Sequence, residues 1–315
     1  WCLTVSFTHP HDPYVARRKY WDLYKDCAHL LPEVPAMAYA DHDAHSRRLF
    51  DANDWRSFEI TEDDIRRSRR AYFANISYLD AKIGEILDVL ERTRQEAMIV
   101  FLSDHGDMLG ARGLWFKMSF FEGSARVPLM ISHPEMETRT VEQPVSTLDL
   151  CLTLCGLAGA ETPGRWPAAE FIDGLSHGQH RETPVLMEYA AEGSVAPMVG
   201  VVQGHWKYIR CAADPEQFFN LHEDPHEERN LAEDSAVQPM LDVFRDIADR
   251  TWDIDRFDAE VRQSQARRWV VYEALRNGAY YPWDYQPLRR ASDRFMRNHM
   301  DLNTVEERQR FPRGE

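Results

Sequence analysis

The sequence predicts an α/β protein with part of a doubly wound sheet, a smaller C-terminal antiparallel sheet and an extended C-terminal arm. A long helical pattern is followed by the continuous apolar run at 97–103, which is typical of a parallel strand covered on both faces. Short apolar segments separated by turns follow residue 184, as in a small antiparallel sheet. Residues 277–315 are aromatic, basic and irregular, which indicates an arm that packs on a surface.

The N-terminal part is expected to contain one strand and one long helix. Residues 1–8 form an apolar pattern that ends at the proline-containing loop "THPHDPY", so we expect a buried strand there. Residues 19–60 lack a period and indicate loops with short helices. Thr61 followed by Asp64 is the pattern of a helix N-cap, and apolar residues recur at steps of four and three up to Leu90. This predicts one amphipathic helix.

The rest of the chain is expected to form further strands, helices and a polar connector near 161–184. The expected elements are a strand at 127–132, a helix at 147–159 ended by glycine, strands at 184–190, 197–204 and 205–211 closed by a turn, and helices near 237–275. We therefore expect three parts: an α/β unit at 1–183, a small antiparallel sheet with a helix at 184–262, and a helix with the arm at 263–315.

Composition excludes several classes of protein. The net charge of -15 argues against a nucleic-acid-binding surface. No apolar run reaches the roughly 18 residues needed to cross a membrane. The five cysteines lack a paired C-x-x-C spacing, so a disulfide framework or zinc site is not expected, and a reducing, cytoplasmic location fits best. The chain opens at Trp1 in a strand pattern, which we interpret as a truncated start with any targeting signal upstream.

Asp104 and His105 directly follow the expected strand at 97–103, and Gly106 allows a sharp turn. In open parallel sheets, ligands bind at the carboxyl ends of strands. A carboxylate suits calcium, magnesium or manganese, and an adjacent imidazole extends the choice to manganese or zinc. The pair is therefore a candidate metal site. The alternative is a capping aspartate beside a structural histidine.

Lys117 and His11 are candidates for contact with an anionic substrate. Lys117 lies among aromatic residues in "GLWFKMSFFEG", where its ammonium group must reach solvent or meet an anion such as sulfate or phosphate. His11 is presented from a loop that is stiffened by prolines, which suits a general acid, and His9 competes for this role. The alternatives are a surface lysine and a surface histidine.

These segments together resemble one family. "PHDPY" after the first strand, the helix "YFANISYLDAKIGEIL", "SDHGD", a lysine twelve residues after the histidine, and "HWKYIR" followed by "FFNLHEDPHEERNLA" are similar to the sulfatase branch of the alkaline phosphatase superfamily. The similarity covers residues 1–235. "PVLMEYAAEGS" and "RRWVVYEALRNGAYYPWDYQPLRRAS" resemble the choline-sulfatase subgroup and extend the similarity to the C-terminus.

The resemblance implies an alkaline-phosphatase-like sheet and roles for particular residues. Asp104 and His105 would bind a divalent cation, usually calcium with manganese or magnesium as alternatives. Lys117 would contact the sulfate and its bridging oxygen, and His11 would lie near the leaving group. Glu188 is the candidate for the choline ammonium group, with a solvated surface glutamate as the alternative.

The resemblance also implies a role for the C-terminal arm. In the subgroup this arm reaches a neighbouring subunit, which would place Trp283 and Asp284 at a substrate site between subunits of a homo-oligomer. A quaternary ammonium group is recognised by charge and by aromatic faces. The alternative is an arm that packs on its own domain.

One expected feature of the family does not occur in these residues. Sulfatases use a cysteine in C-x-P-x-R, oxidised to formylglycine, and no cysteine here begins that motif. The resemblance places this nucleophile, and a second pair of metal ligands, upstream of residue 1. We therefore expect a choline-sulfatase that hydrolyses choline O-sulfate when intact, and no activity from residues 1–315 alone. The alternatives are a phosphonate monoester or phosphodiester hydrolase, and a non-catalytic remnant that binds quaternary amines.

Overall fold

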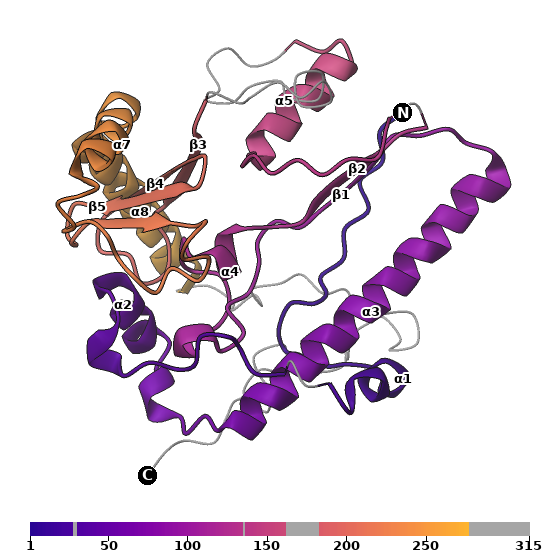
Figure 1. Cartoon of the computed structure of the whole chain (residues 1–315), viewed down its shortest axis with the longest axis horizontal. Helices are drawn as coiled ribbons and strands as arrows, with labels where there is room; N and C mark the ends of the chain where they lie inside the picture. The colour runs from indigo at the N-terminus through magenta and orange to yellow at the C-terminus, as the bar shows by residue number, and fades with distance from the viewer. Residues whose placement is uncertain (28–29, 135, 162–182, 277–315) are drawn as a thin grey trace.

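The computed structural model describes residues 1–27, 30–134, 136–161 and 183–276. Figure 1 shows the long helix α3 on one side, the sheet of β1 and β2 beside it, and the larger sheet with α7 and α8 at the opposite end. The helices are α1 (Arg18–Trp21), α2 (Ala44–Ala52), α3 (Glu62–Thr93), α4 (Glu122–Ala125), α5 (Thr147–Leu157), α7 (Gln238–Thr251) and α8 (Ile254–Arg276). The strands are β1 (Ile99–Leu102), β2 (Leu129–Ser132), β3 (Val185–Tyr189), β4 (Met198–Gln203), β5 (Trp206–Cys211) and β6 (Gln217–Asn220).

The predicted long helix is confirmed as α3. Thr61 is its N-cap: the Thr61 hydroxyl accepts from the backbone N–H of Asp64, and the Asp64 side chain accepts from the backbone N–H of Thr61. This reciprocal pair satisfies two amide donors that a helix start leaves unpaired. The expected short helices of 19–60 are α2 and α1, which begins one residue earlier at Arg18. Helices α5, α7 and α8 also form within their predicted ranges.

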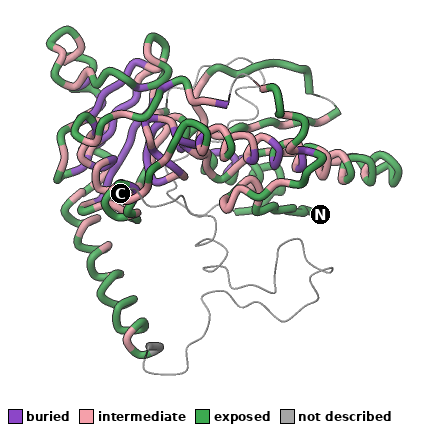
Figure 2. Tube along the Cα trace, turned by 90° about the horizontal axis from the view of Figure 1, so that it is seen from below, coloured by how far each residue is buried: buried purple, intermediate pink, exposed green. Residues whose placement is uncertain are grey.

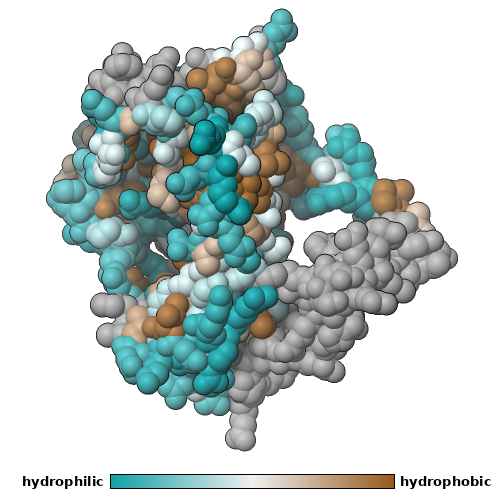
Figure 3. All heavy atoms as spheres, turned by 90° about the vertical axis from the view of Figure 1, so that its right-hand side faces the viewer, coloured by the Kyte–Doolittle hydropathy of each residue, from teal (hydrophilic) through white to brown (hydrophobic). Residues whose placement is uncertain are grey.

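The strand expected at residues 1–8 does not form. This segment has no regular structure, and Trp1, Leu3, Val5 and Phe7 are exposed. A strand needs a neighbour that supplies hydrogen bonds and covers its faces. Within the described residues no strand pairs with this segment, so an apolar pattern alone does not make it a buried strand. Exposed apolar side chains appear as separate groups on the face drawn in Figure 3.

The expectation of a central parallel strand at 97–103 is also wrong for this part of the chain. β1 pairs with β2 in a two-stranded antiparallel sheet, with Ile99 opposite Ser132 and Leu102 opposite Leu129. A parallel pair needs a crossover of a dozen or more residues, usually a long helix. The connection from β1 to β2, residues 103–128, is long enough for a crossover, but it holds only the 3₁₀ turn Ala111–Gly113 and the short helix α4 in place of a long helix, and β2 runs antiparallel to β1.

The C-terminal antiparallel sheet is confirmed, with one strand more than expected. β3, β4, β5 and β6 lie in sequence order, and every neighbouring pair is antiparallel. The segment expected to be a closing turn begins with β6, because Phe218 and Phe219 alternate between the two faces. Figure 2 shows the strongest burial in this sheet, whereas α8 is mostly exposed.

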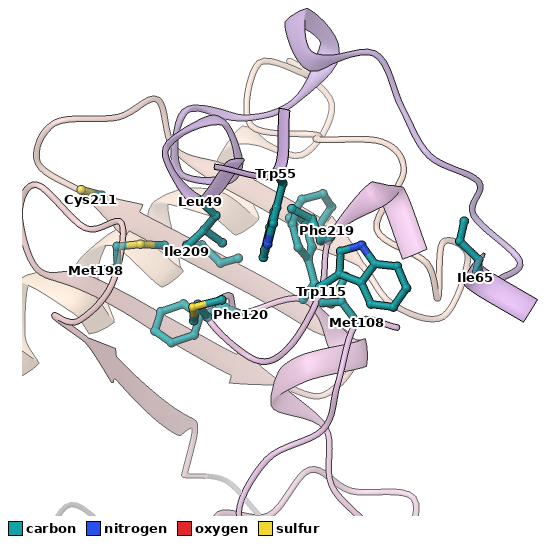
Figure 4. Packing of buried hydrophobic residues seen from close by; sticks show 13 residues of the cluster. Leu49, Trp55, Ile65, Met108, Trp115, Phe120, Met198, Ile209, Cys211 and Phe219 are labelled. Carbon is teal, nitrogen blue, oxygen red and sulfur yellow. The ribbon is translucent and has the colours of Figure 1, made fainter. Parts of the chain in front are cut away.

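The two faces of the larger sheet pack against different parts of the chain. One face carries Leu186, Val201, Tyr208 and Phe218 and packs on α7. The other face packs on the loop between β1 and β2, and its contacts are shown in Figure 4. That second cluster includes Trp115, Phe120, Met198, Ile209 and Phe219. The sheet therefore supports the loop that carries the expected lysine.

Candidate active site

The loop that follows residue 8 brings His11 next to Lys117. The Nζ atom of Lys117 lies 3.0 Å from Nε2 of His11. Because an ammonium group can only donate, Nε2 accepts this hydrogen bond and the imidazole carries its proton on Nδ1. Nδ1 lies 2.7 Å from the carbonyl oxygen of Asp12 and 3.1 Å from Oδ1 of the same residue. Asp12 therefore orients the ring so that Nε2 faces the lysine.

Asp104 and His105 lie beside this pair. Oδ2 of Asp104 is 3.7 Å from Nε2 of His105, and the Asp104 side chain is 86% exposed. The ring centroids of His105 and His11 are 6.5 Å apart. The structure thus brings together His11, Asp104, His105 and Lys117, which the sequence presents in three separate segments.

The Asp104–His105 pair fits a divalent cation. Nδ1 of His105 lies 2.8 Å from the carbonyl oxygen of Gly106, and its backbone N–H donates to Oδ1 of Asp104 at 3.0 Å. A metal-binding histidine typically donates its second ring N–H to a carbonyl oxygen, which directs the other nitrogen at the ion. Oδ2 of Asp104 and Nε2 of His105 are the two atoms that remain to ligate a metal ion. No group of three His, Cys, Asp or Glu side chains able to hold a metal occurs in the described ranges, so an ion would need further ligands.

Ser124 of helix α4 contacts both the turn after Asp104 and His105 and the backbone of Lys117. The backbone N–H of Gly106 donates to the carbonyl oxygen of Ser124 at 2.7 Å. A Cβ at Gly106 would lie 2.2 Å from the carbonyl oxygen of Gly123, so only glycine permits this approach. The Ser124 hydroxyl donates to the carbonyl oxygen of Lys117. Ser124 therefore touches both halves of the site through its own backbone and side chain.

A buried ion pair on the larger sheet holds α4 in place. Lys207 on β5 is 1% exposed, and its Nζ donates to Glu227 at 2.8 Å, to Glu122 at 2.5 Å and to the carbonyl oxygen of Phe120 at 2.7 Å. The backbone N–H of Glu122 also donates to Glu227 at 2.7 Å. Burial raises the pKa of Glu227, while Lys207 opposes that rise. The start of α4 is therefore attached to the sheet by this ion pair and by the Glu122 amide hydrogen bond.

Two residues that sequence reasoning missed link the two loops of the site. The Tyr14 hydroxyl donates to Oδ2 of Asp107 at 2.7 Å. Burial raises the pKa of both groups. Tyr14 lies in "PHDPY" and Asp107 in "SDHGD", so both were inside recognised motifs. Nothing in either motif shows that these residues meet, because they are far apart in the sequence.

The other expected substrate contacts do not join this cluster in the described residues. Glu188 lies on β3 and is exposed, and its Oε1 accepts from Nε1 of Trp252 at 2.7 Å. Its neighbour Met187 belongs to the core that faces the site loop, so successive side chains place Glu188 on the opposite face of the sheet. Its role in binding the ammonium group stays a prediction. Trp283 and Asp284 lie outside the described residues.

Among the described helices, none combines the length and the apolar character that a membrane span needs. This agrees with the absence of a long apolar run in the sequence.

Sequence profiles of known families match this chain. The Sulfatase profile matches residues 1–160, the profile of the N-sulphoglucosamine sulphohydrolase C-terminal region matches 110–251, and the profile of the choline sulfatase C-terminal region matches 259–311. The chain is 59% identical to a choline-sulfatase of Rhizobium meliloti over its whole length, which is 63% of that relative. The chain therefore spans less than two thirds of that protein.

More distant relatives share the fold. The chain is 27% identical to a multifunctional alkaline phosphatase superfamily protein of Trinickia caryophylli, over 81% of this chain and 56% of that protein. A phosphonate monoester hydrolase from Silicibacter pomeroyi superposes with a TM-score of 0.62 at 21% identity, over 82% of this chain and 54% of that one. These neighbours confirm the alkaline-phosphatase-like α/β fold. With the Sulfatase profile covering residues 1–160 of the 315, the chain belongs to the sulfatase family.

Proposed function

We propose that the protein hydrolyses choline O-sulfate to choline and sulfate. We also propose that residues 1–315 supply the part of the active site that faces the leaving group. The observation that carries this proposal is the contact of Lys117 with His11 beside Asp104 and His105. A cationic donor, an imidazole and a hard-ligand pair are the groups that hydrolysis of an anionic ester requires. The 59% identical choline-sulfatase supports the choice of ester.

The residues of this chain would act on the leaving group. Asp104 and His105 would hold a divalent cation, calcium with manganese or magnesium as alternatives, and that ion supplies positive charge to the sulfuryl oxygens when bound. The Lys117 ammonium group donates a hydrogen bond to the bridging oxygen and gives up a proton as the C–O⁻ group of choline departs. His11 accepts from Lys117 at 3.0 Å and holds the ammonium group in place before the reaction.

The nucleophile belongs to the same proposal. We infer that the nucleophile would be a hydroxyl group of the hydrated aldehyde of a formylglycine, supplied by a segment outside residues 1–315. This is consistent with the family, and with the fact that no cysteine in this chain begins C-x-P-x-R. We also propose a cytoplasmic location, on the pattern of cysteine usage in the sequence.

We propose that Glu188 and the C-terminal arm bind the ammonium group of choline, although within the described residues the Glu188 side chain lies on the sheet face opposite the Lys117 loop. Glu188 supplies a carboxylate beside the Trp252 indole, and charge with an aromatic group is the combination that binds a quaternary ammonium ion. Trp283 and Asp284 would add the same two kinds of group from the arm of a neighbouring subunit in a homo-oligomer. Replacing Glu188→Gln should raise KM for choline sulfate far more than KM for an uncharged alkyl sulfate. Equal effects on both esters would remove Glu188 from the ammonium site.

The choice of reaction is tested by substrate comparison. The protein produced from its whole reading frame is assayed on choline sulfate and on an aryl phosphonate monoester, with kcat/KM measured for each. We expect higher kcat/KM on choline sulfate. The likeness to a phosphonate monoester hydrolase makes phosphonate or phosphodiester hydrolysis the second candidate, and a preference for the phosphonate would establish it. Binding of choline without turnover of either ester would leave the quaternary-amine-binding alternative.

A further inference from the structure

The carboxylate of Asp107 is the point at which the two loops of the site meet. Its Oδ2 accepts from the Tyr14 hydroxyl at 2.7 Å. Its Oδ1 accepts from the backbone N–H of Leu109 at 2.9 Å and from the backbone N–H of Phe116 at 3.0 Å. One side chain therefore receives donors from the loop that carries His11 and from the loop that carries Lys117.

On the lysine side, Asp107 fixes the residue directly before Lys117. Phe116 has a φ of +64°, a left-handed conformation that a phenylalanine adopts only when its surroundings impose it. Its N–H is held by Asp107 and its carbonyl oxygen accepts from the backbone N–H of Met108 at 2.8 Å. The backbone from which the Lys117 side chain extends is therefore determined by Asp107.

On the histidine side, Tyr14 fixes the loop three residues after His11. The Tyr14 ring lies 6.1 Å from the ring of Tyr72 on α3 and 6.5 Å from the ring of Trp115, measured between centroids. These contacts place the ring, and the hydroxyl adds the directional bond to Asp107. The position of the His11 loop relative to the lysine loop therefore depends on the Tyr14 hydroxyl.

Asp107 is linked to Lys117 through Phe116 and to the His11 loop through Tyr14. The contact between Lys117 and His11 joins these two links. A lysine side chain has four rotatable methylene groups, so the 3.0 Å contact depends on how its backbone and its partner are anchored. We propose that Tyr14 and Asp107 are positioning residues that set the distance between His11 and Lys117 for protonation of the leaving group. This inference rests on the proposed function, because it assigns the pair to the same hydrolytic site.

Comparing esters with different leaving groups distinguishes a positioning role of Tyr14 and Asp107 from a general structural role. The choline alkoxide is strongly basic and needs a proton as the C–O⁻ group departs, whereas para-nitrophenolate departs as an anion. Tyr14→Phe keeps the ring and removes only the hydroxyl. In the protein produced from its whole reading frame, we expect this variant to lower kcat on choline sulfate by about 10- to 100-fold. On para-nitrophenyl sulfate we expect a change of less than about threefold.

Two further variants serve as controls. Tyr72→Phe removes a hydroxyl from the ring that touches Tyr14, and Tyr72 does not bond Asp107 among the described contacts, so the ratio of the two rates should stay unchanged. Asp107→Asn keeps an oxygen for the two backbone donors and offers an N–H to the Tyr14 oxygen. It should therefore retain more activity on choline sulfate than Asp107→Ala.

The outcomes distinguish this inference from the proposed function. Equal losses on both esters for Tyr14→Phe, or no loss on either, would overturn the positioning role. If the unmodified protein fails on choline sulfate but hydrolyses a simple alkyl sulfate, the proposed substrate is wrong. The same comparison of alkyl with aryl sulfate then still decides the positioning role. Absence of turnover on every sulfate ester would overturn both.

Discussion

Two lysines, one within the segment 117–124 and one bonded to that segment, differ in what surrounds them. Lys207 is 1% exposed and donates to two carboxylates and a carbonyl oxygen. Lys117 is only half-buried and donates to an imidazole nitrogen. A buried ammonium group with several acceptors is neutralised inside the protein, so it serves the fold. An ammonium group whose partner is uncharged keeps its charge for a ligand.

The largest expected effect tests the structural lysine. Lys207→Met leaves the buried Glu227 without its cation, whereas Glu122 keeps Arg126 at 3.9 Å, and an unpaired buried charge typically costs about 3–5 kcal/mol of unfolding free energy. Urea unfolding measures this loss. Combining Lys207→Met with Glu227→Gln removes the unpaired charge and keeps an acceptor for the Glu122 amide, so the double variant should recover part of the stability. Equal losses in the single and double variants would show that charge is not the cause.

The next effect tests the other lysine. Lys117→Ala should lower kcat/KM on choline sulfate by about 10²- to 10³-fold, the usual cost of removing one donor to a developing negative charge. The unfolding free energy should change by less than about 0.5 kcal/mol, because the side chain is partly exposed and its partner among the described residues, His11, is exposed as well. A loss of stability as large as that of Lys207→Met would remove the distinction between the two lysines.

The smallest expected effect concerns a buried histidine next to the site loop. His45 is 3% exposed, its Nε2 lies 2.6 Å from the carbonyl oxygen of Met118, and burial lowers its pKa below the ordinary value of 6.5. Below pH 6.5 the unfolded chain binds a proton at this position and the folded chain does not. The unfolding free energy should therefore decrease as the pH is lowered below 6.5, by up to about 1.4 kcal/mol per pH unit for this residue.

Replacing His45→Gln provides the control for that pH dependence. The variant should show a smaller slope of unfolding free energy between pH 6.5 and acidic pH, measured by urea unfolding at several pH values. Burial also lowers the pKa of His42, so some slope should remain. An unchanged slope in the variant would mean that His45 takes up a proton without unfolding the chain.

The sequence predicted local elements well and buried strands poorly. The Thr61–Asp64 cap, the length of α3 and the strands β3, β4 and β5 were all predicted, because capping, periodicity and turns act over a few residues. The strand at 1–8 and the parallel strand at 97–103 were not confirmed. An apolar run becomes a buried strand only where neighbouring strands cover it, and those neighbours are distant in sequence.

By itself the sequence determined the capped start of α3, the antiparallel sheet and the candidates His11, Asp104, His105 and Lys117, because each lies in a short pattern of its own. Only the tertiary structure decided that His11 meets Lys117, that Tyr14 bonds Asp107, and that Lys207 is buried against Glu227. These contacts join segments that are distant along the chain. Their free energy depends on distance and burial in the folded state, and neither quantity is carried by residue type or spacing.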